Sequence, residues 1–223
     1  KNALAVEYFK KRKFTFFQSE LNTRLLFIEG QIYQKANEYD QATKCFKKTA
    51  RRAGDYEMQF ASNLNIAMCY DPKKSSSKSI ISRLNKMAED KKNVEYRDQV
   101  YYALGEVYFR DKNVDKACTQ WEESVHLSTT NKQQKITSAL RAADTYFSLL
   151  EKYEKAQMYY DTALAVMPKD YPNRANIESR QKVLTNLVTD LRCVERWDSL
   201  IAMSMLSQEE LDRRINSYIE EYK

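Results

Sequence analysis

Four tyrosines recur along the chain at nearly equal intervals. The distances between Tyr33, Tyr70, Tyr108 and Tyr146 are 37, 38 and 38 residues. Each tyrosine lies three residues after a small one, and these small residues are Gly30, Ala67, Gly105 and Ala143. A fixed period of this length predicts a repeat architecture, in which each unit buries its apolar face against its neighbours.

Three of the four tyrosines are followed by a second pair of small and large residues. An alanine comes nine or ten residues later, and a large aromatic residue follows it by four; the pairs are Ala42 with Phe46, Ala117 with Trp121, and Ala156 with Tyr160. Small residues let two antiparallel helices approach closely, while the flanking rings fill the volume beside the crossing. This pattern resembles the tetratricopeptide repeat, a helix–turn–helix unit. The resemblance implies an all-α solenoid with a curved surface that binds other proteins.

The composition agrees with an all-helical chain. Only 3 Gly and 3 Pro occur among 223 residues, which leaves few turn residues for a β-sandwich or barrel. No stretch approaches the roughly 20 apolar residues needed to span a bilayer. We expect about four repeats over residues 1–172, then a C-terminal helical cap and a trailing amphipathic helix over 173–223.

Breaks in the pattern place the helices. Outside repeats three and four, the expected helices span residues 2–11, 18–36, 39–52, 56–70, 78–90, 173–198 and 207–222. Repeat two is irregular, because Asp71-Pro72 ends its first helix and Leu84 stands among the residues where alanine and an aromatic are expected. In repeat four the turn is one residue longer than in repeat three. Ser207 and Glu210 form a capping box before the last helix.

The net charge of +6 is concentrated near the start of the chain. Residues 1–60 hold 12 Lys and Arg against 7 Asp and Glu, and the densest run is Lys10–Lys13. Such runs bind nucleic acid or anionic surfaces in some proteins, although most are solvated helix faces. Nucleic-acid or anionic-surface binding through this region is therefore the alternative function to protein binding.

The sequence contains no catalytic or metal-binding signature. The only histidine is His126, and no Cys-x-x-Cys pair occurs among the cysteines Cys45, Cys69, Cys118 and Cys193. We interpret the cysteines as buried thiols that behave as small apolar side chains. The chain is therefore expected to be no enzyme, with no metal, no cofactor and no small-molecule substrate.

The candidate binding site is the concave face, which the first helix of each repeat lines. Counting from the small residue of each repeat gives Phe27, Gln31, Gln34, Leu64, Asn65, Met68, Gln99, Tyr102, Glu106, Phe109, Leu140, Arg141, Asp144 and Phe147. Exposed aromatic residues among polar groups suit the anchoring of a peptide. The alternative is that Phe109 and Phe147 only pack between repeats.

Several longer motifs extend the resemblance to one family. They are Lys10–Lys13, Tyr56-Glu57-Met58-x-Phe60, Tyr96-x-Asp98–Glu106, Pro168–Pro172 and Asp198-Ser199-Leu200. In this order they resemble the tetratricopeptide lipoproteins of the type IX secretion and gliding machinery of the Bacteroidetes (PorW/SprE type). The resemblance implies a non-enzymatic protein on the periplasmic face of the outer membrane that contacts a secretion core subunit. It also implies that the chain is the middle of a longer protein, with any membrane anchor outside it.

Overall fold

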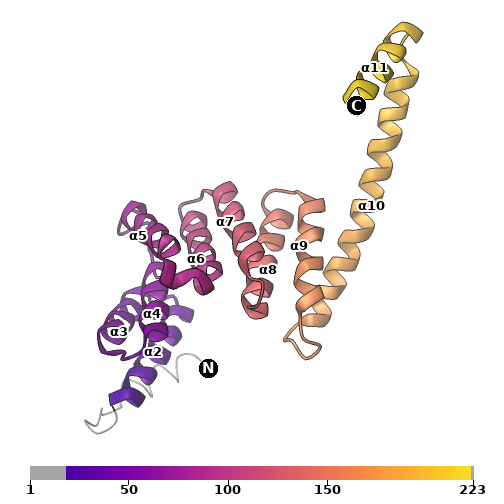
Figure 1. Cartoon of the computed structure of the whole chain (residues 1–223). Coiled ribbons are helices and arrows are strands. Elements are labelled where there is room, and N and C mark those ends of the chain that lie inside the picture. Colours follow the sequence, from indigo (N-terminus) through magenta and orange to yellow (C-terminus); the bar gives the residue numbers. More distant parts are fainter. Residues whose placement is uncertain (1–18, 222–223) are drawn as a thin grey trace.

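The computed structural model describes residues 19–221, which form a row of antiparallel helices with no strand in that range (Figure 1). The α-helices are α2 (Ser19–Lys35), α3 (Tyr39–Arg52), α4 (Tyr56–Met68), α5 (Lys78–Glu89), α6 (Arg97–Arg110), α7 (Val114–Leu127), α8 (Lys132–Ser148), α9 (Tyr153–Val166), α10 (Arg174–Ser204) and α11 (Gln208–Glu221). A 3-10 helix, η2 (Lys91–Tyr96), precedes α6. The fold is an all-α helical-hairpin solenoid, as predicted.

The expected helix boundaries are confirmed with two changes. The helix expected after residue 173 continues to Ser204 instead of ending at 198, since residues 199–204 contain no Gly or Pro. The sequence does not reveal η2. The capping box is confirmed, because the Ser207 amide donates to Glu210 and the Glu210 amide approaches the Ser207 hydroxyl at 3.4 Å. The helix expected at residues 2–11 lies outside the described residues.

Close helix crossings occur where the small residues predict them. A Cβ atom added at Gly30 would lie 2.7 Å from Cε1 of Phe46. One added at Gly105 would lie 2.3 Å from Nε1 of Trp121. Both distances are shorter than a Cβ atom allows without a shift of the ring. Glycine therefore lets α2 touch α3 at the first crossing and α6 touch α7 at the second.

Three turns within repeats share one backbone conformation. Asn37, Lys112 and Glu151 have φ values of 61°, 61° and 52°, in the left-handed region. In each turn the next residue donates its amide to the carbonyl of the repeat tyrosine, as in the bond from Glu38 to Tyr33. Glu151 comes one position later after its tyrosine than the other two, which confirms the longer turn of repeat four.

Repeat two departs from this arrangement, as expected. Its second helix, α5, buries Leu84 and Ala88 in a core shared with α4 and α6. The η2 segment is joined to α4 by two hydrogen bonds: Tyr56 donates to Asn93 at 2.7 Å, and Tyr96 donates to Glu57 at 3.0 Å. Polar bonds therefore add to the apolar core of this irregular repeat.

The long helix α10 has two different halves. Its first half covers α9 through the buried side chains of Leu184 and Val188. Its second half leaves the row of helices, and α11 turns back beside the far end (Figure 1). Among the described residues, no helix is long and apolar enough to cross a membrane.

The cysteines only partly follow the prediction. Cys45, Cys69 and Cys118 are buried, and burial raises the pKa of each thiol to about 11. Cys193 is exposed on the second half of α10, so the expectation of burial is wrong for it. The neighbouring Arg192 pairs with Glu154 of α9 at 2.6 Å, but this contact leaves the thiol uncovered.

Candidate functional site

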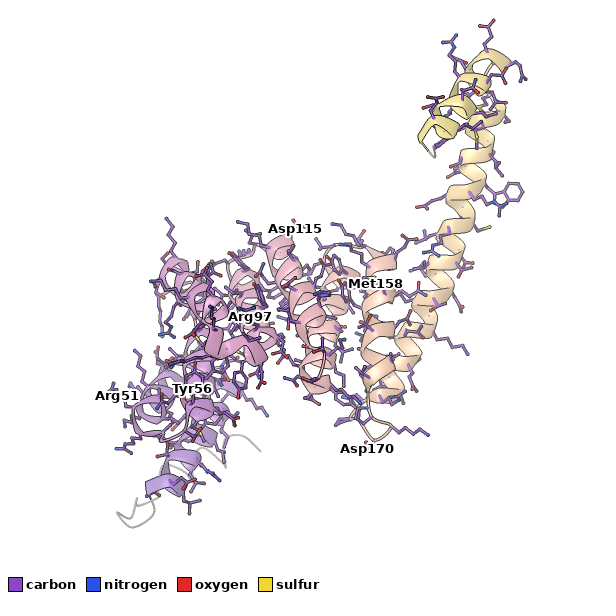
Figure 2. All side chains as sticks on the ribbon, viewed as in Figure 1. Arg51, Tyr56, Arg97, Asp115, Met158 and Asp170 are labelled. Atoms are coloured by element: carbon purple, nitrogen blue, oxygen red, sulfur yellow. The ribbon has the colours of Figure 1, made fainter. Side chains whose placement is uncertain are left out.

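A cleft of about 690 Å³ lies between α8 and the start of α10. We name it the α8–α10 cleft, and its lining residues are Gln133, Leu140, Asp144, Tyr160, Tyr171, Pro172, Asn173, Asn176, Ile177 and Arg180. The loop between α9 and α10, in which Figure 2 labels Asp170, contributes Tyr171, Pro172 and Asn173 to the lining. The cleft therefore lies where the last repeat meets the long helix.

On one side of the cleft, an ion pair between Arg180 and Asp144 joins α10 to α8, and the Tyr160 hydroxyl bonds to both charged groups. Nη1 of Arg180 lies 2.8 Å from Oδ1 of Asp144 and 3.1 Å from the Tyr160 hydroxyl. The Tyr160 hydroxyl donates to the same carboxylate. Burial is the main cause that raises the pKa of Tyr160 to about 12, so this hydroxyl stays protonated at neutral pH. The arrangement fixes α10 to α8 and is electrically neutral.

The other lining residues offer apolar surface and amide groups. Leu140, Tyr171 and Ile177 are partly buried and form apolar walls. Within the described residues, the side-chain amides of Gln133 and Asn176 have no hydrogen-bond partner, which leaves their donors and acceptors to a ligand. The cleft can therefore hold an apolar side chain while hydrogen-bonding the backbone of a peptide.

A second group of side chains joins α6 to α8. We name Tyr102, Glu106, Phe109 and Arg141 the inner cluster. Nε of Arg141 donates to Glu106 at 2.7 Å, and a second nitrogen approaches the same carboxylate at 3.4 Å. The guanidinium lies over the Phe109 ring, 4.4 Å from its centroid. Arg141 thus makes an ion pair with Glu106 and a cation–π contact with Phe109.

This pairing changes the expected role of Glu106. The sequence predicts an acceptor between two aromatic anchors, but Arg141 already occupies the carboxylate. Phe109 also packs against Trp121, with ring centroids 5.6 Å apart, so it belongs partly to the core. Burial raises the pKa of the half-buried Tyr102. The inner cluster is therefore a preformed surface with few unpaired groups.

The predicted site residues of the first two repeats are less available. Leu64 is only 6% exposed and belongs to the core of repeat two, so its assignment to the binding surface is wrong. The Asn65 amide donates to the Ala61 carbonyl of its own helix. Met68 packs against the same core, and Phe27 packs edge-on against Phe46. Gln31 is exposed.

Of the remaining predicted residues, one lines the cleft and two lie elsewhere on α6 and α8. Gln99 is half-buried in the first turn of α6, and Asp144 lines the cleft. Phe147 is 37% exposed and contacts Tyr153, with ring centroids 6.0 Å apart. The sequence did not indicate Tyr171, Asn176 or Arg180, since the repeat pattern ends before them. The Pro168–Pro172 segment was the signal that the chain changes direction here.

Two further expectations concern the basic run near the start of the chain and metal binding. The basic run Lys10–Lys13 lies outside the described residues. Among the described residues there is no group of three or more His, Cys, Asp or Glu side chains that could hold a metal ion.

Comparison with known families agrees with the repeat geometry. Two family models, both described as tetratricopeptide repeat, match residues 23–56 and residues 96–169. The unmatched stretch between them contains the irregular helices α4 and α5. No curated protein matches the chain. The matches and the helical fold support the tetratricopeptide repeat superfamily, whose members are typical protein-binding scaffolds.

Proposed function

We propose that this chain is a non-enzymatic scaffold that binds an extended segment of a partner protein. The segment lies along the inner cluster and enters the α8–α10 cleft with one apolar side chain. The supporting observation is the cleft itself, which combines a volume of about 690 Å³, apolar walls and unpartnered amides. Clefts of this size with convergent polar groups beside apolar walls are common binding sites, and half of the residues that line this one are polar or charged.

The charges of the two surfaces favour apolar anchoring. Glu106 is neutralised by Arg141 and Asp144 by Arg180, so neither surface carries a net charge for a charged ligand to neutralise. Desolvated aromatic and aliphatic anchors supply most of the free energy at such interfaces. We therefore expect affinity to depend on apolar contacts and to change little with salt.

The proposal is tested by blocking the cleft without disturbing the core. Asn176 is exposed and lines the cleft, while the adjacent Ala175 is exposed and does not. A random-peptide display library selects a ligand for the purified chain, and fluorescence anisotropy then measures its Kd. Asn176→Arg should weaken binding at least tenfold, and Ala175→Arg should leave it within twofold. Equal binding by both variants contradicts the proposal.

The cellular role that we propose is in type IX secretion or gliding, on the periplasmic face of the outer membrane. This proposal rests on the motifs quoted above, such as Pro168–Pro172, and the partner it implies is a secretion core subunit. Deletion of the gene should block export of proteins that carry type IX signals. Asn176→Arg should reproduce the defect at normal protein level, and unchanged export in the deletion strain contradicts this role.

A further inference from the structure

The outer face of α3 carries a band of positive charge. We name four exposed cations of this helix the basic stripe, and they are Lys44, Lys47, Lys48 and Arg51. Their spacing of three, one and three residues places them within about 100° of one helix face. The opposite face is buried against α2 and α4. Figure 2 labels Arg51 at the outer edge of α3. The basic stripe is therefore turned away from the core of the repeats.

The fold does not neutralise the basic stripe. Within residues 19–221, none of its four side chains forms an ion pair. The one acidic residue of α3, Asp40, is bonded to Lys74 at 2.5 Å. Like charges four residues apart, of which the stripe contains two pairs, destabilise a helix. The stripe therefore costs the free protein stability, which an anionic ligand would restore.

The positive charge is specific to this part of the row. The helix α3 contains five basic residues and one acidic residue. In contrast, α7 and α9, the second helices of the last two repeats, each contain one lysine and more acidic than basic residues. The repeat fold thus does not require a basic second helix. The charge of α3 points to something that this helix meets.

The surroundings of the basic stripe select among anionic partners. A protein interface depends on desolvated apolar anchors, but the described residues of α3 include no exposed large apolar side chain. Single-stranded nucleic acid is held by exposed aromatic rings, whereas Phe46 is buried and Tyr39 lies under Arg110. Three of the four cations are lysines. Their compact charge on a flexible stem suits phosphates that move, while arginine is preferred for the fixed phosphates of nucleic acids.

We propose that the basic stripe docks this chain on a bilayer that contains anionic phospholipids. Lipids diffuse within the bilayer, so each lysine can meet a phosphate headgroup without a fixed geometry. Basic residues close to such a surface add their attractions, which fade within the Debye length of about 10 Å at 0.1 M salt. Because the apolar face of α3 stays in the core, the contact is peripheral and reversible. The stripe shares no residue with the inner cluster or the α8–α10 cleft, so this inference does not depend on the proposed peptide site.

Two double variants with the same net charge provide a matched test. Lys47→Gln with Lys48→Gln removes two charges from the basic stripe and is named the stripe variant. Lys132→Gln with Lys182→Gln removes two charges from α8 and α10 and is the control. All four side chains are exposed, and glutamine is about as good a helix former as lysine. Both variants should therefore keep the melting temperature of the wild-type chain.

Co-sedimentation with vesicles measures the binding. The wild-type chain should bind vesicles made of equal parts of phosphatidylglycerol and phosphatidylcholine, more weakly as salt rises, and should not bind phosphatidylcholine alone. The stripe variant should bind at least tenfold more weakly, and the control should stay within twofold of the wild type.

Three results would overturn the proposal. The first is unchanged binding by the stripe variant, which would place the contact elsewhere on the chain. The second is an equal loss in both variants, which would show attraction by net charge alone. The third is tighter binding, per anionic group, to a DNA duplex or a poly-glutamate peptide that the stripe variant loses, which would replace the lipid surface by that partner.

Discussion

The two halves of the repeat row are held together differently. In α7–α9 one continuous apolar core runs through the helices, and its alanines are fully buried, as at Ala117 and Ala143. In α2–α6 the core is divided between two clusters, one around Phe46 and one around Phe60. Polar contacts connect them, since Arg110 stacks on the Tyr39 ring and donates to the Tyr70 carbonyl at 2.7 Å.

This difference has a consequence for dynamics and for binding. Segments with few buried apolar contacts open locally at lower free energy than a continuous core. We therefore expect α7–α9 to be the stiffer half. The inner cluster joins α6 to that half through Arg141, and the α8–α10 cleft adjoins it. A preorganised surface loses less conformational entropy on binding, which suits the place we propose for the partner.

The largest effect should come from filling a closest crossing in the stiff half. Ala117 is 0% exposed, so Ala117→Arg forces a guanidinium into a packed core. Overpacking and a buried charge together should lower the free energy of unfolding by roughly 3–5 kcal/mol. Thermal unfolding measures the loss, with Thr119→Arg on the exposed face of α7 as the control. An unchanged melting temperature contradicts the assigned helix register.

A single methyl group should distinguish the two glycine crossings. Gly105→Ala places Cβ 2.3 Å from Trp121 and should destabilise the protein by roughly 1–3 kcal/mol. Gly30→Ala meets only ring atoms of Phe46, at 2.7 Å or more, and alanine regains about 1 kcal/mol of helix propensity. We expect Gly30→Ala to cost less than Gly105→Ala in urea unfolding. Gly54→Ala, with no atom within 4 Å, is the control. The reverse order refutes the comparison.

Buried thiols report which half opens first. Cys69 lies beside the polar contacts of the first half, and Cys118 lies in the continuous core. Under native conditions a thiol reagent should label exposed Cys193 at once, then Cys69, and last Cys118. Arg110→Ala removes the stacking on Tyr39 and should speed labelling of Cys69 about tenfold, which corresponds to about 1.4 kcal/mol. Mass spectrometry follows each site, and faster labelling of Cys118 than of Cys69 contradicts the assignment of the stiff half.

The smallest effect is a pH dependence at the contact between α6 and α7. Asp98 is buried and accepts a hydrogen bond from Ser128, and burial raises the pKa of its carboxyl group. Because the folded state then holds the proton more tightly than the unfolded state, stability is greatest below the ordinary carboxyl pKa. It falls as pH rises through the raised folded pKa. Asp98→Asn should remove this dependence. A free energy of unfolding that rises with pH over this range in the wild-type protein contradicts this prediction.

The sequence predicts most of the fold because close helix packing requires small and aromatic residues at fixed spacings. A helix crossing as close as that between Gly105 and Trp121 tolerates few residues, so the repeat can be recognised one position at a time. The burial of Leu64 was missed because α5 and η2 pack irregularly, and no periodic pattern describes them. The α8–α10 cleft was missed because Arg180 and Asn176 follow the last repeat. Their position depends on how α10 settles against α9, which is a tertiary contact.

The central claim is that the partner lies along the inner cluster and the α8–α10 cleft. A small photo-crosslinking residue, of a size that does not fill the cleft as arginine does, is introduced at Asn176 and tests it directly, with the same residue at Met158 as the control. Met158 is 49% exposed on α9 and does not line the cleft; it is labelled in Figure 2. The peptide selected from the library should cross-link to position 176 and not to position 158. Cross-linking at position 158, or equally at both, contradicts the account.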